Sequence, residues 1–546
     1  MSSPQGPQLN LTPQEEEVCE VLRQVVHTLS MTQKSDRMNP PLVIRIAGGW
    51  VRDKLLGLAC HDLDIAASSM TGAELAEAVV QWLEAQGKET RSVGKISVNP
   101  ERSKHLETAT TWVAGLPIDF VHLRNETYGE DSRIPTTVAF GTPEQDAYRR
   151  DITINALFYN IHSRQVEDFV GTGLKDLRDH RVRTPLPPIE TFMDDPLRIL
   201  RCIRFTCRFH FALDPATYEA MCLPQVQEAL ARKISRERIG VEVTKMLRGP
   251  GPTEALKLLH RAGLFPIVFE AAGVPIIDPK VSLDTATALY KIIQGSPEDA
   301  KVLLGMVGSG DAEGAGSWEE TIYLAAALWH LRGQDVSRGK KEISAASVVI
   351  KESLKLSNAQ ADCITGLFLA QTHVEELIQT TGHDRVKLGL AIREMGRHPH
   401  VGPAWRLALP LHLAGRMAQG SSEISLEPYL DLLKEIEEQD LSHTYELKYA
   451  IDGKAMAKAL GIPLGFWIRD ILENYVIPWQ LARGPLIQDT ERDNLGPLCM
   501  KWIMEKQEEI KAYAEKAGQK AKEAAVADAE RRKKEKQTRK KQHIHD

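Results

Sequence analysis

The spacing of apolar and polar residues predicts a small sheet in the first third of the chain. Residues 42–47 form an apolar, β-rich run, and a second strand is expected at Asp62-Leu63-Asp64, where acidic and apolar residues alternate. Residues 108–114 and 118–123 have the pattern of the two strands of a hairpin. Helical segments separate these strands, so the pattern predicts an α+β domain.

Helical periodicity dominates the rest of the chain. A helix is expected over residues 15–30, and the capping box Thr71-x-x-Glu74 opens another. Residues 125–147 lack periodicity, and we predict a mobile loop there. From residue 148 the pattern is helical except for one β-like stretch at residues 158–169, and no strand is predicted after residue 250.

Composition narrows the class of protein. A chain of 546 residues exceeds one hydrophobic core, so several domains are expected. Apolar residues make up 42% and charged residues 26%, as in soluble proteins, and no apolar run could span a bilayer, so we expect no membrane association. The seven cysteines are scattered without a CxxC pair, which argues against disulfides and zinc and for a reducing compartment.

Charge is unevenly distributed. The net charge of −6 does not indicate a nucleic-acid ligand, but residues 531–541 are rich in Lys and Arg and end a charged helical arm expected over residues 503–541. Three interpretations of this run stay open: contact with RNA phosphates, a nuclear localisation signal, or a solubilising tail.

The first candidate site combines two glycines with two carboxylates. Gly48 and Gly49 have no Cβ, so their backbone can approach a phosphate closely, and a helix beginning near Trp50 adds its positive end. Asp62 and Asp64 share one face of a strand, about 7 Å apart. Two carboxylates beside a phosphate cradle suit Mg²⁺, which completes its shell with phosphate oxygens and water. The alternative is an ordinary strand-turn-helix with surface aspartates.

Asp119 is a third candidate carboxylate. The predicted hairpin places it on a strand expected to lie beside the strand of Asp62 and Asp64. There it would complete a two-metal site or act as base on an attacking hydroxyl. The alternative is a solvent-facing aspartate on an edge strand.

A second constellation is Arg149-Arg150-Asp151-x-x-x-Asn155, which we expect to open a helix. Paired guanidinium groups give fixed, bidentate donors that suit phosphate or sugar oxygens. The same triplet is also typical of a surface cluster of ion pairs.

A third constellation begins at Asp194 and Asp195, either of which would cap a helix that starts near Pro196. Asp195 and Arg198 are neighbours at i and i+3, and the carboxylate and guanidinium match the pairing edge of cytosine or adenine. Uracil and guanine would present an oxygen to the carboxylate and be repelled. The alternative is a capping aspartate with a local ion pair. Three arginines recur along one broad face of this helix: Arg198, Arg201 and Arg204.

Together these motifs resemble those of the tRNA nucleotidyltransferases, or CCA-adding enzymes, in the class II branch with eukaryotic and many bacterial members. They are, in order, GGxVRD from Gly48, DxD from Asp62, RRDxxxNA from Arg149 and DDPLRxLRxxRF from Asp194. Residues 168–177 and 235–238 are similar to the family's linking and later helical motifs.

The resemblance is strong over about residues 40–250 and weak beyond, where residues 461–480 are similar to the eukaryotic tail. The basic extension and Gly-rich inserts are similar to those of fungal members. Asp194 stands where the family usually has Glu, but Asp195 and Arg198 are both present, so we expect unaltered selectivity.

The resemblance implies a polymerase-beta-like nucleotidyltransferase head with a small antiparallel or mixed sheet, followed by all-α neck, body and tail domains. The expected boundaries, in chain order, are an N-terminal extension 1–40, head 41–160, neck 161–250, body 251–420, tail 421–511 and basic arm 512–546.

The resemblance also implies roles for the candidate residues. Asp62 and Asp64 would bind Mg²⁺, while Asp195 and Arg198 would read C or A with support from Arg201 and Arg204. The remaining candidates would bind the incoming nucleotide: Gly48, Gly49, Arg52, Arg149, Arg150, Asp151 and Asn155.

The implied activity is template-independent addition of C, C and A to the 3′ end of tRNA from CTP and ATP, with release of diphosphate. The helical half would bind tRNA, and residues 125–147 would act as a lever in the change from C to A. Two alternatives stay open: a poly(A) polymerase of the same superfamily and a catalytically inactive RNA-binding relative. We expect a monomer in cytoplasm and nucleus. The N-terminus carries no convincing mitochondrial address, so import would need a longer form.

Overall fold

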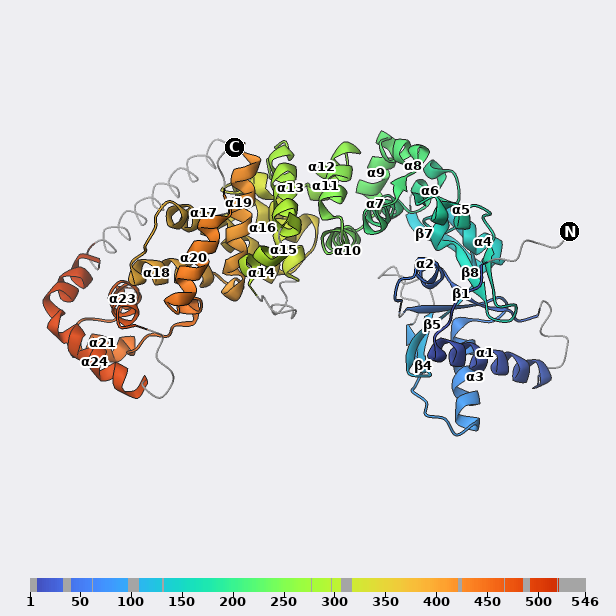
Figure 1. Ribbon diagram of the computed structural model, residues 1–546, viewed down its shortest axis with the longest axis horizontal. Helices are drawn as coiled ribbons and strands as arrows, with labels where there is room; N and C mark the ends of the chain where they lie inside the picture. The colour runs from blue at the N-terminus through green and yellow to red at the C-terminus, as the bar shows by residue number, and fades with distance from the viewer. Residues whose placement is uncertain are drawn as a thin grey trace, which may run out of the picture. The chain divides into compact units, whose positions relative to one another are not determined.

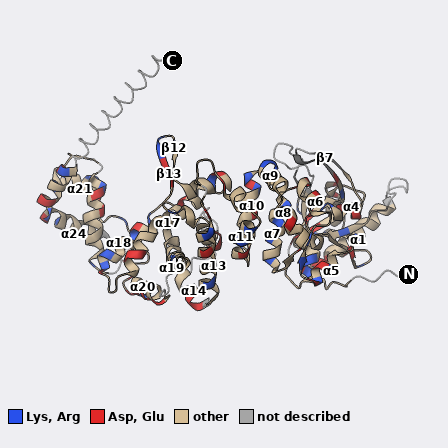
Figure 2. Cartoon of the chain, turned by 90° about the horizontal axis from the view of Figure 1, so that it is seen from above, with Lys and Arg blue, Asp and Glu red and all other residues tan. Residues whose placement is uncertain are grey.

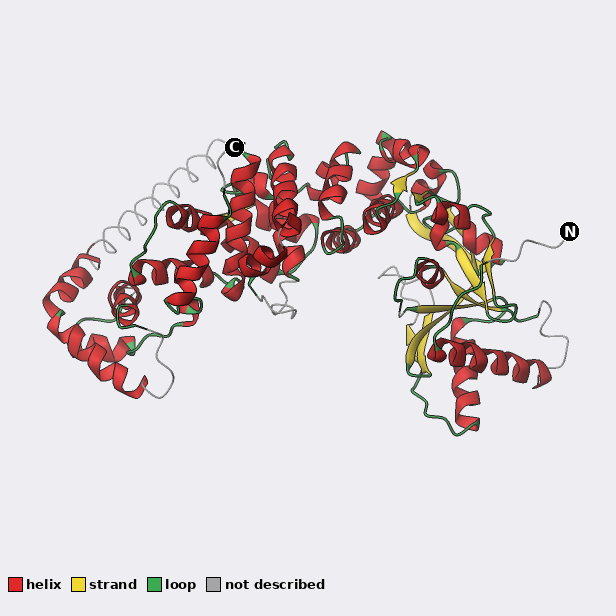
Figure 3. Cartoon of the chain, in the orientation of Figure 1, coloured by secondary structure: helices red, strands yellow, loops and turns green. Residues whose placement is uncertain are grey.

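The computed structural model describes residues 7–32, 41–60, 62–96, 108–129, 132–275, 277–295, 297–305, 317–420, 425–465, 467–484, 492–517 and 519. The chain divides into two compact units. The first comprises Met1–Ile276 with Val348–Leu356, and the second comprises Ile277–Ser347 with Ser357–Asp546. Strands are concentrated in the first unit (Figure 3).

A seven-stranded mixed sheet forms the framework of the first unit (Figure 1). Every neighbouring pair of strands is antiparallel except β2 and β5, which run parallel. The predicted α+β class is therefore confirmed. The spatial order of the strands is β3 (Gly94–Ile96), β4 (Thr108–Val113), β5 (Leu116–His122), β2 (Leu63–Ala67), β1 (Ile44–Ala47), β8 (Leu157–Asn160) and β9 (Gln165–Asp168).

The predicted hairpin is confirmed as β4 and β5, which pair in an antiparallel register. Its turn lies at Ala114 and Gly115, both with positive φ, slightly earlier than the glycine-proline connection we expected. The β-like stretch predicted at residues 158–169 is a second hairpin, β8 and β9, which joins the main sheet through β1. The sheet therefore extends past residue 160.

Three helices cover the sheet: α1 (Pro13–Thr32), α2 (Gly49–Leu55) and α3 (Gly72–Ala85). Both predicted helices are confirmed, and Thr71 and Glu74 form the expected reciprocal cap of α3. The helix α3 packs closely on β5, because a Cβ at Gly72 would lie 2.1 Å from the Phe120 carbonyl oxygen. The strand that carries Asp119 is thereby fixed from one side.

The prediction of a mobile loop over residues 125–147 is wrong for the residues that the structure describes. They form an antiparallel ribbon followed by a short helix whose N-terminus is capped by Thr142 and Gln145. Pro135 lies inside the second strand, where a central sheet would exclude it but a two-stranded ribbon tolerates it. The elements are β6 (Arg124–Gly129), β7 (Ser132–Phe140) and α4 (Pro143–Tyr148).

The prediction that Arg149 opens a helix is also wrong. Arg149 follows the end of α4, and only a single 3₁₀ turn, η2 (Thr153–Asn155), forms before β8. The Asp151 carboxylate accepts hydrogen bonds from the Ile152 backbone and the Asn155 side chain. Such local bonds compete with helix formation and hold a turn instead.

The remainder of the first unit is mostly helical. Its longest described helix after the sheet, α7 (Leu197–Phe209), buries Leu200 and Ile203 and packs on α10 and α11. The elements are α5 (Gly173–Arg178), β10 (Arg181–Val182), α6 (Pro188–Asp194), α7, β11 (Ala212–Leu213), α8 (Pro215–Met221), α9 (Pro224–Lys233), α10 (Arg236–Leu247), α11 (Pro252–Arg261), α12 (Phe265–Phe269) and the π-helical η4 (Val349–Ser353).

In the described residues of the second unit, one hairpin accompanies the helices, β12 (Asp335–Arg338) and β13 (Lys341–Ser344), which contradicts our prediction of no strand after residue 250. In the view of Figure 2, acidic and basic residues are interspersed along its helices. The other elements, with α16 at the boundary, are α13 (Lys280–Gly295), α14 (Pro297–Leu304), α15 (Trp318–Ala327), η3 (Trp329–Leu331), α16 (Ala345–Val348), α17 (Asn358–Ile378), α18 (Arg385–Gly396), η5 (Gly402–Leu407), α19 (Ala408–Ala418), α20 (Glu427–Glu438), η6 (Thr444–Glu446), α21 (Gly453–Leu460), α22 (Trp467–Ile471), η7 (Leu472–Val476), α23 (Ile477–Leu481) and α24 (Arg492–Glu505).

The predicted charged arm is helical as far as residue 517, whereas the basic run at residues 531–541 lies outside the described residues. None of the helices in the described ranges is both long enough and apolar enough to cross a membrane.

Candidate active site

Three carboxylates meet on neighbouring strands of the sheet. Asp64 on β2 is the register partner of Asp119 on β5, and adjacent strands are separated by about 4.8 Å. Asp62 immediately precedes β2, on the same face as Asp64, because the intervening Leu63 is buried. All three aspartates are exposed to solvent, and Thr110 donates a hydrogen bond to Asp119 at 2.5 Å. The predicted neighbourhood of Asp119 and the Asp62–Asp64 pair is thus present.

Asp64 differs electrostatically from an ordinary surface carboxylate. Its side chain reaches solvent, but the protein atoms crowded around it displace much of its hydration. This desolvation raises the pKa of Asp64 to about 6; Arg150 opposes the increase, and Asp119 and Asp62 add to it. The carboxylates therefore repel one another, and a cation between them would relieve that repulsion.

The two glycines form the turn between β1 and α2. Gly48 has φ 73° and ψ −119°, a conformation that residues with a side chain rarely adopt, and its N–H donates to the Leu157 carbonyl at 2.9 Å. Gly49 is the first residue of α2. A Cβ at Gly48 would lie 2.5 Å from the Arg150 guanidinium, so Arg150 lies directly over this turn.

Arg52 is buried and bound to protein groups. Its guanidinium donates to Asp53 at 2.8 Å and to the Asn155 side chain, and it lies 4.8 Å from the ring centre of Phe209. Burial lowers the pKa of Arg52, and the Asp53 carboxylate opposes this effect. In this structure Arg52 connects α2 with η2 and α7.

Both arginines of the Arg149–Arg150 pair bind a single carboxylate, Asp146. Arg149 donates to one oxygen of Asp146 and Arg150 to the other, at 2.9 Å each, and Asp146 is only 1% exposed. Burial by itself would raise the pKa of Asp146, but Arg150 and Arg149 hold it at about 2. The pair is therefore part of a buried ion cluster rather than a surface one.

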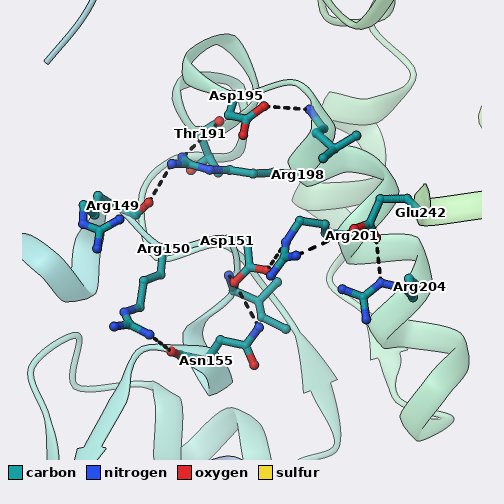
Figure 4. A network of polar contacts seen from close by, with 12 residues as sticks. Arg149, Arg150, Asp151, Asn155, Thr191, Asp195, Arg198, Arg201, Arg204 and Glu242 are labelled. Carbon is teal, nitrogen blue, oxygen red and sulfur yellow. Dashed lines mark hydrogen bonds and ion pairs between the residues drawn. The ribbon is translucent and has the colours of Figure 1, made fainter. Parts of the chain in front are cut away.

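Asp151 and Asn155 lie in the same buried region (Figure 4). Asp151 accepts from Arg201 at 2.7 Å and from the Asn155 side chain at 3.0 Å. Burial opposes ionisation here too, yet Arg201 and Asn155 hold the pKa of Asp151 at about 2. Asp151 thus joins the turn before β8 to helix α7.

Glu242 on α10 binds the next two arginines of α7. Arg204 donates to Glu242 at 2.6 Å, and Arg201 lies 3.7 Å from the other oxygen (Figure 4). The charge of Asp151 is the main cause that raises the pKa of Arg201. Arg201 and Arg204, which we expected to support the base-reading face, are therefore held by carboxylates from two other segments.

Asp195 and Arg198 each have a different partner. Arg238 donates to Asp195 at 3.0 Å. Arg198 instead donates to the carbonyl oxygens of Thr191 at 3.2 Å and Arg149 at 2.6 Å (Figure 4). The N-cap residue of α7 is Pro196, not Asp194 or Asp195 as predicted, although the Asp195 carboxylate accepts from the Leu197 N–H at 3.3 Å. Arg198 is 6% exposed and donates to the segment that carries Arg149 and Arg150, so the two residues that we expected to read the base lie beside the candidate phosphate site.

Sequence reasoning missed four residues that hold the site: Glu15, Asp146, Arg238 (as the partner of Asp195) and Glu242. Glu15 accepts from the Trp50 indole at 3.0 Å and from Lys54 at 2.6 Å, and thereby anchors α1 to α2. The capping box at Thr142 would have revealed the helix of Asp146, as the one at Thr71 revealed α3. We find no comparable sequence signal for Glu242.

The described residues contain no group of three or more His, Cys, Asp or Glu side chains arranged to hold a metal ion. Asp62 and Asp64, with Asp119 beside them, are nevertheless all oxygen donors of the kind that hard divalent cations prefer.

Comparison with known proteins identifies the family. Residues 44–183 match the poly A polymerase head domain, and residues 210–275 match a probable RNA and SrmB-binding site of polymerase A. The mitochondrial CCA tRNA nucleotidyltransferase of Saccharomyces cerevisiae is 38% identical over 507 residues, which cover 87% of this chain and 91% of the yeast protein. The chain belongs to the CCA tRNA nucleotidyltransferase family. The protein of the same name from Candida glabrata is 36% identical, covering 89% of this chain and 95% of that protein.

Solved structures of CCA-adding enzymes share the fold. The Bacillus stearothermophilus enzyme in complex with CTP has a TM-score of 0.57 at 22% identity, covering 92% of this chain and 100% of that one. The Thermotoga maritima enzyme complexed with tRNA has a TM-score of 0.54 at 18% identity, and the match covers 89% of this chain and 95% of that one. The family that the four motifs indicated is thus confirmed: the chain is a nucleotidyltransferase, and membership of this family implies a divalent metal cofactor.

Asp146→Asn tests the buried ion cluster. At about pH 7 it should lower the free energy of unfolding by about 3–5 kcal/mol, because two half-buried guanidinium groups lose their shared buried counter-charge. The folded pKa of about 2 lies below the ordinary value of 3.8, so the ionised carboxylate stabilises the fold above about pH 4, and this contribution is lost as the pH falls toward 2.

Urea unfolding of wild type and variant at about pH 7 and about pH 3 checks this expectation. The difference between the two proteins should shrink at the lower pH. Asp179→Asn, at an exposed position on the end of α5, is the matched control. Its free energy of unfolding should equal that of wild type at both pH values. A difference that is equal at the two pH values would contradict the proposed ionisation of Asp146.

Proposed function

We propose that this protein adds C, C and A to the 3′ end of tRNA without a nucleic-acid template, using CTP and ATP and releasing diphosphate. The observation that carries the proposal is the position of Asp64 on β2, Asp119 on β5 and Asp62 just before β2. The same unit contains the Gly48–Gly49 turn, Asp195 and Arg198. The names and the CTP and tRNA complexes of the relatives support the same substrates.

Mg²⁺ is the cation that we assign to the carboxylates. Asp62 and Asp64 would hold it, and Asp119 is the further catalytic carboxylate, placed to ligate it or to accept the proton of the attacking hydroxyl. The fit rests on the all-oxygen donor set and on the desolvation of Asp64, which raises its pKa to about 6 and to which the charges of Asp119 and Asp62 add. When bound, the metal neutralises phosphate charge and lowers the pKa of the attacking 3′-hydroxyl.

The triphosphate would lie over the turn between β1 and α2. Gly49 offers its backbone N–H group at the start of α2, Gly48 lets the chain turn there, and Arg150 lies over the same turn. Arg149, Asp151 and Asn155 shape this region through the buried ion cluster. Arg52 binds a phosphate only if it exchanges its present bonds to Asp53 and Asn155.

The base would be read by Asp195 and Arg198. Arg238 orients the Asp195 carboxylate, and the carbonyls of Thr191 and Arg149 orient the Arg198 guanidinium. A carboxylate that accepts from an exocyclic amine and a guanidinium that donates to a ring acceptor select cytosine and adenine over uracil and guanine. Arg201 and Arg204 would hold the helix that presents this pair.

The remaining assignments concern partners and location. The match at residues 210–275 to a probable RNA-binding site supports tRNA contact by the helical part of the chain. Two relatives are named as mitochondrial enzymes, and we infer a mitochondrial pool in addition to the expected cytoplasmic and nuclear ones. A monomer remains our prediction.

Purified protein, incubated with tRNA that lacks its 3′-terminal CCA, tests the function directly. With CTP and ATP together, the product should grow by C, C and A and then stop; CTP alone should give only the cytidines. A poly(A) polymerase would need no CTP and would not stop, and an inactive relative would leave the tRNA unchanged.

Asp62→Ala should abolish incorporation of both nucleotides and leave the fold intact, because Asp62 is an exposed residue with no packing role. Turnover with CTP and with ATP, measured beside the unfolding temperature, checks this expectation. Asp179→Ala, exposed on the same unit, should keep wild-type turnover. Retention of more than a few per cent of turnover by Asp62→Ala would remove Asp62 from the metal site.

Arg198→Ala should lower the preference for CTP over UTP by about tenfold to a hundredfold, and should weaken triphosphate binding less. The ratio of kcat/KM for the two nucleotides measures the preference, and binding of inorganic tripolyphosphate measures the phosphate site. Arg208→Ala is the control, because it removes an arginine side chain that is 43% exposed on the same helix. It should change neither the CTP/UTP ratio of kcat/KM nor the binding of tripolyphosphate. An unchanged CTP/UTP ratio in Arg198→Ala would exclude Arg198 from base selection.

A further inference from the structure

Arg124 is a buried arginine that neither the motifs nor the roles assigned above include. It is the first residue of β6, and its side chain is only 11% exposed. Its backbone is fixed, because its N–H donates to Asp146 at 3.2 Å and a Cβ at Gly141 would lie 2.4 Å from its carbonyl carbon. The side chain is therefore held in one region of the site.

The guanidinium of Arg124 is poorly satisfied. Its Nε and Nη1 atoms are buried, and within the described part of the chain neither makes a hydrogen bond. Its one ion pair there is with Glu126, at 3.6 Å, which is too long for a hydrogen bond. Buried guanidinium groups are normally hydrogen-bonded, because leaving their N–H groups without partners is costly.

Arg124 lies among other arginines. Arg149 and Arg150 lie nearby, and two neighbouring carboxylates, Asp146 and Glu126, already bind Arg149 at 2.9 Å and 3.3 Å. These two carboxylates are therefore engaged by another arginine. Burial lowers the pKa of Arg124 to about 10, and the like charge of Arg149 adds to this effect.

Arg124 adjoins the candidate phosphate site. Its backbone N–H donates to Asp146, Asp146 accepts from Arg150, and Arg150 lies over the Gly48 turn. An anion bound near this turn would supply acceptors for the guanidinium N–H groups that have no partner in the described part of the chain.

We propose that Arg124 is a phosphate ligand of this enzyme, binding a phosphate group of the incoming nucleotide or of the RNA end through its guanidinium group. The inference rests on the proposed function, since it assigns Arg124 to the same site. The competing explanation is that Arg124 only balances the charge of Asp64, in which case the protein has kept a buried, unsatisfied guanidinium for an electrostatic effect alone.

Arg124→Met separates these explanations, because it keeps the bulk of the side chain and removes its donors. Two probes in the presence of Mg²⁺ distinguish the sources of phosphate: inorganic tripolyphosphate represents the nucleotide, and a short single-stranded RNA ending in CC represents the primer. The variant should bind one of them about tenfold to a hundredfold more weakly than wild type, measured by titration calorimetry.

The matched control is Arg178→Met, an exposed arginine at the end of α5, which should bind both probes as wild type does. Without ligand, Arg124→Met should unfold at the wild-type temperature or above it, because the removed donors had no hydrogen bonds to lose. A residue that merely braced the fold would lower that temperature.

Equal affinity of wild type and Arg124→Met for both probes would overturn the inference. If Arg124→Met fails to fold, Arg124→Gln replaces it, because glutamine keeps a polar side chain without the charge. Its affinity for the two probes is then compared with that of wild type. The two proposals fail separately: wild type that adds no cytidine to tRNA overturns the proposed function, whereas active wild type with unchanged binding by the variant overturns only the role of Arg124.

Discussion

Buried carboxylates that bind arginines from other segments of the chain hold the candidate active site together. Asp146 binds Arg149 and Arg150, Asp151 binds Arg201, and Glu242 on α10 binds Arg204. A buried charge that loses its partner costs several kcal/mol. The turn before β8, helix α7 and helix α10 are therefore joined by these ion pairs, which connect the candidate phosphate site to the helix that carries Arg198.

This arrangement separates two regions of opposite charge within one site. On the sheet, the parallel pairing of β2 and β5 brings Asp64 beside Asp119, and within the described residues no ion pair engages Asp62 or Asp64. Beside them lie Arg124 and Arg150, close enough to oppose the rise in the pKa of Asp64. A metal ion bound to a triphosphate is complementary to both regions, because the metal meets the carboxylates and the phosphates meet the arginines.

Local sequence signals predicted the elements that depend on local interactions. The cap at Thr71, the helix at residues 15–30 and the alternation in β4 and β5 are each confirmed. The same reasoning failed at residues 125–147, where Pro135 and the absence of periodicity concealed a ribbon and a capped helix. It also failed at Arg149, where side-chain bonds of Asp151 hold a turn in a stretch that we expected to be helical.

By itself, the sequence determined which chemical groups the site contains and their order along the chain. They are two glycines, two acidic residues on one strand, paired arginines, and an aspartate three residues before an arginine. Together these groups indicated the family. Only the tertiary structure decided which charges meet. Asp195 pairs with Arg238 and Arg198 with backbone carbonyls, although i and i+3 spacing suggested that they would pair with each other. The reason is physical: a buried charged group binds whichever partner the packing of distant segments brings within reach, and sequence spacing does not report that distance.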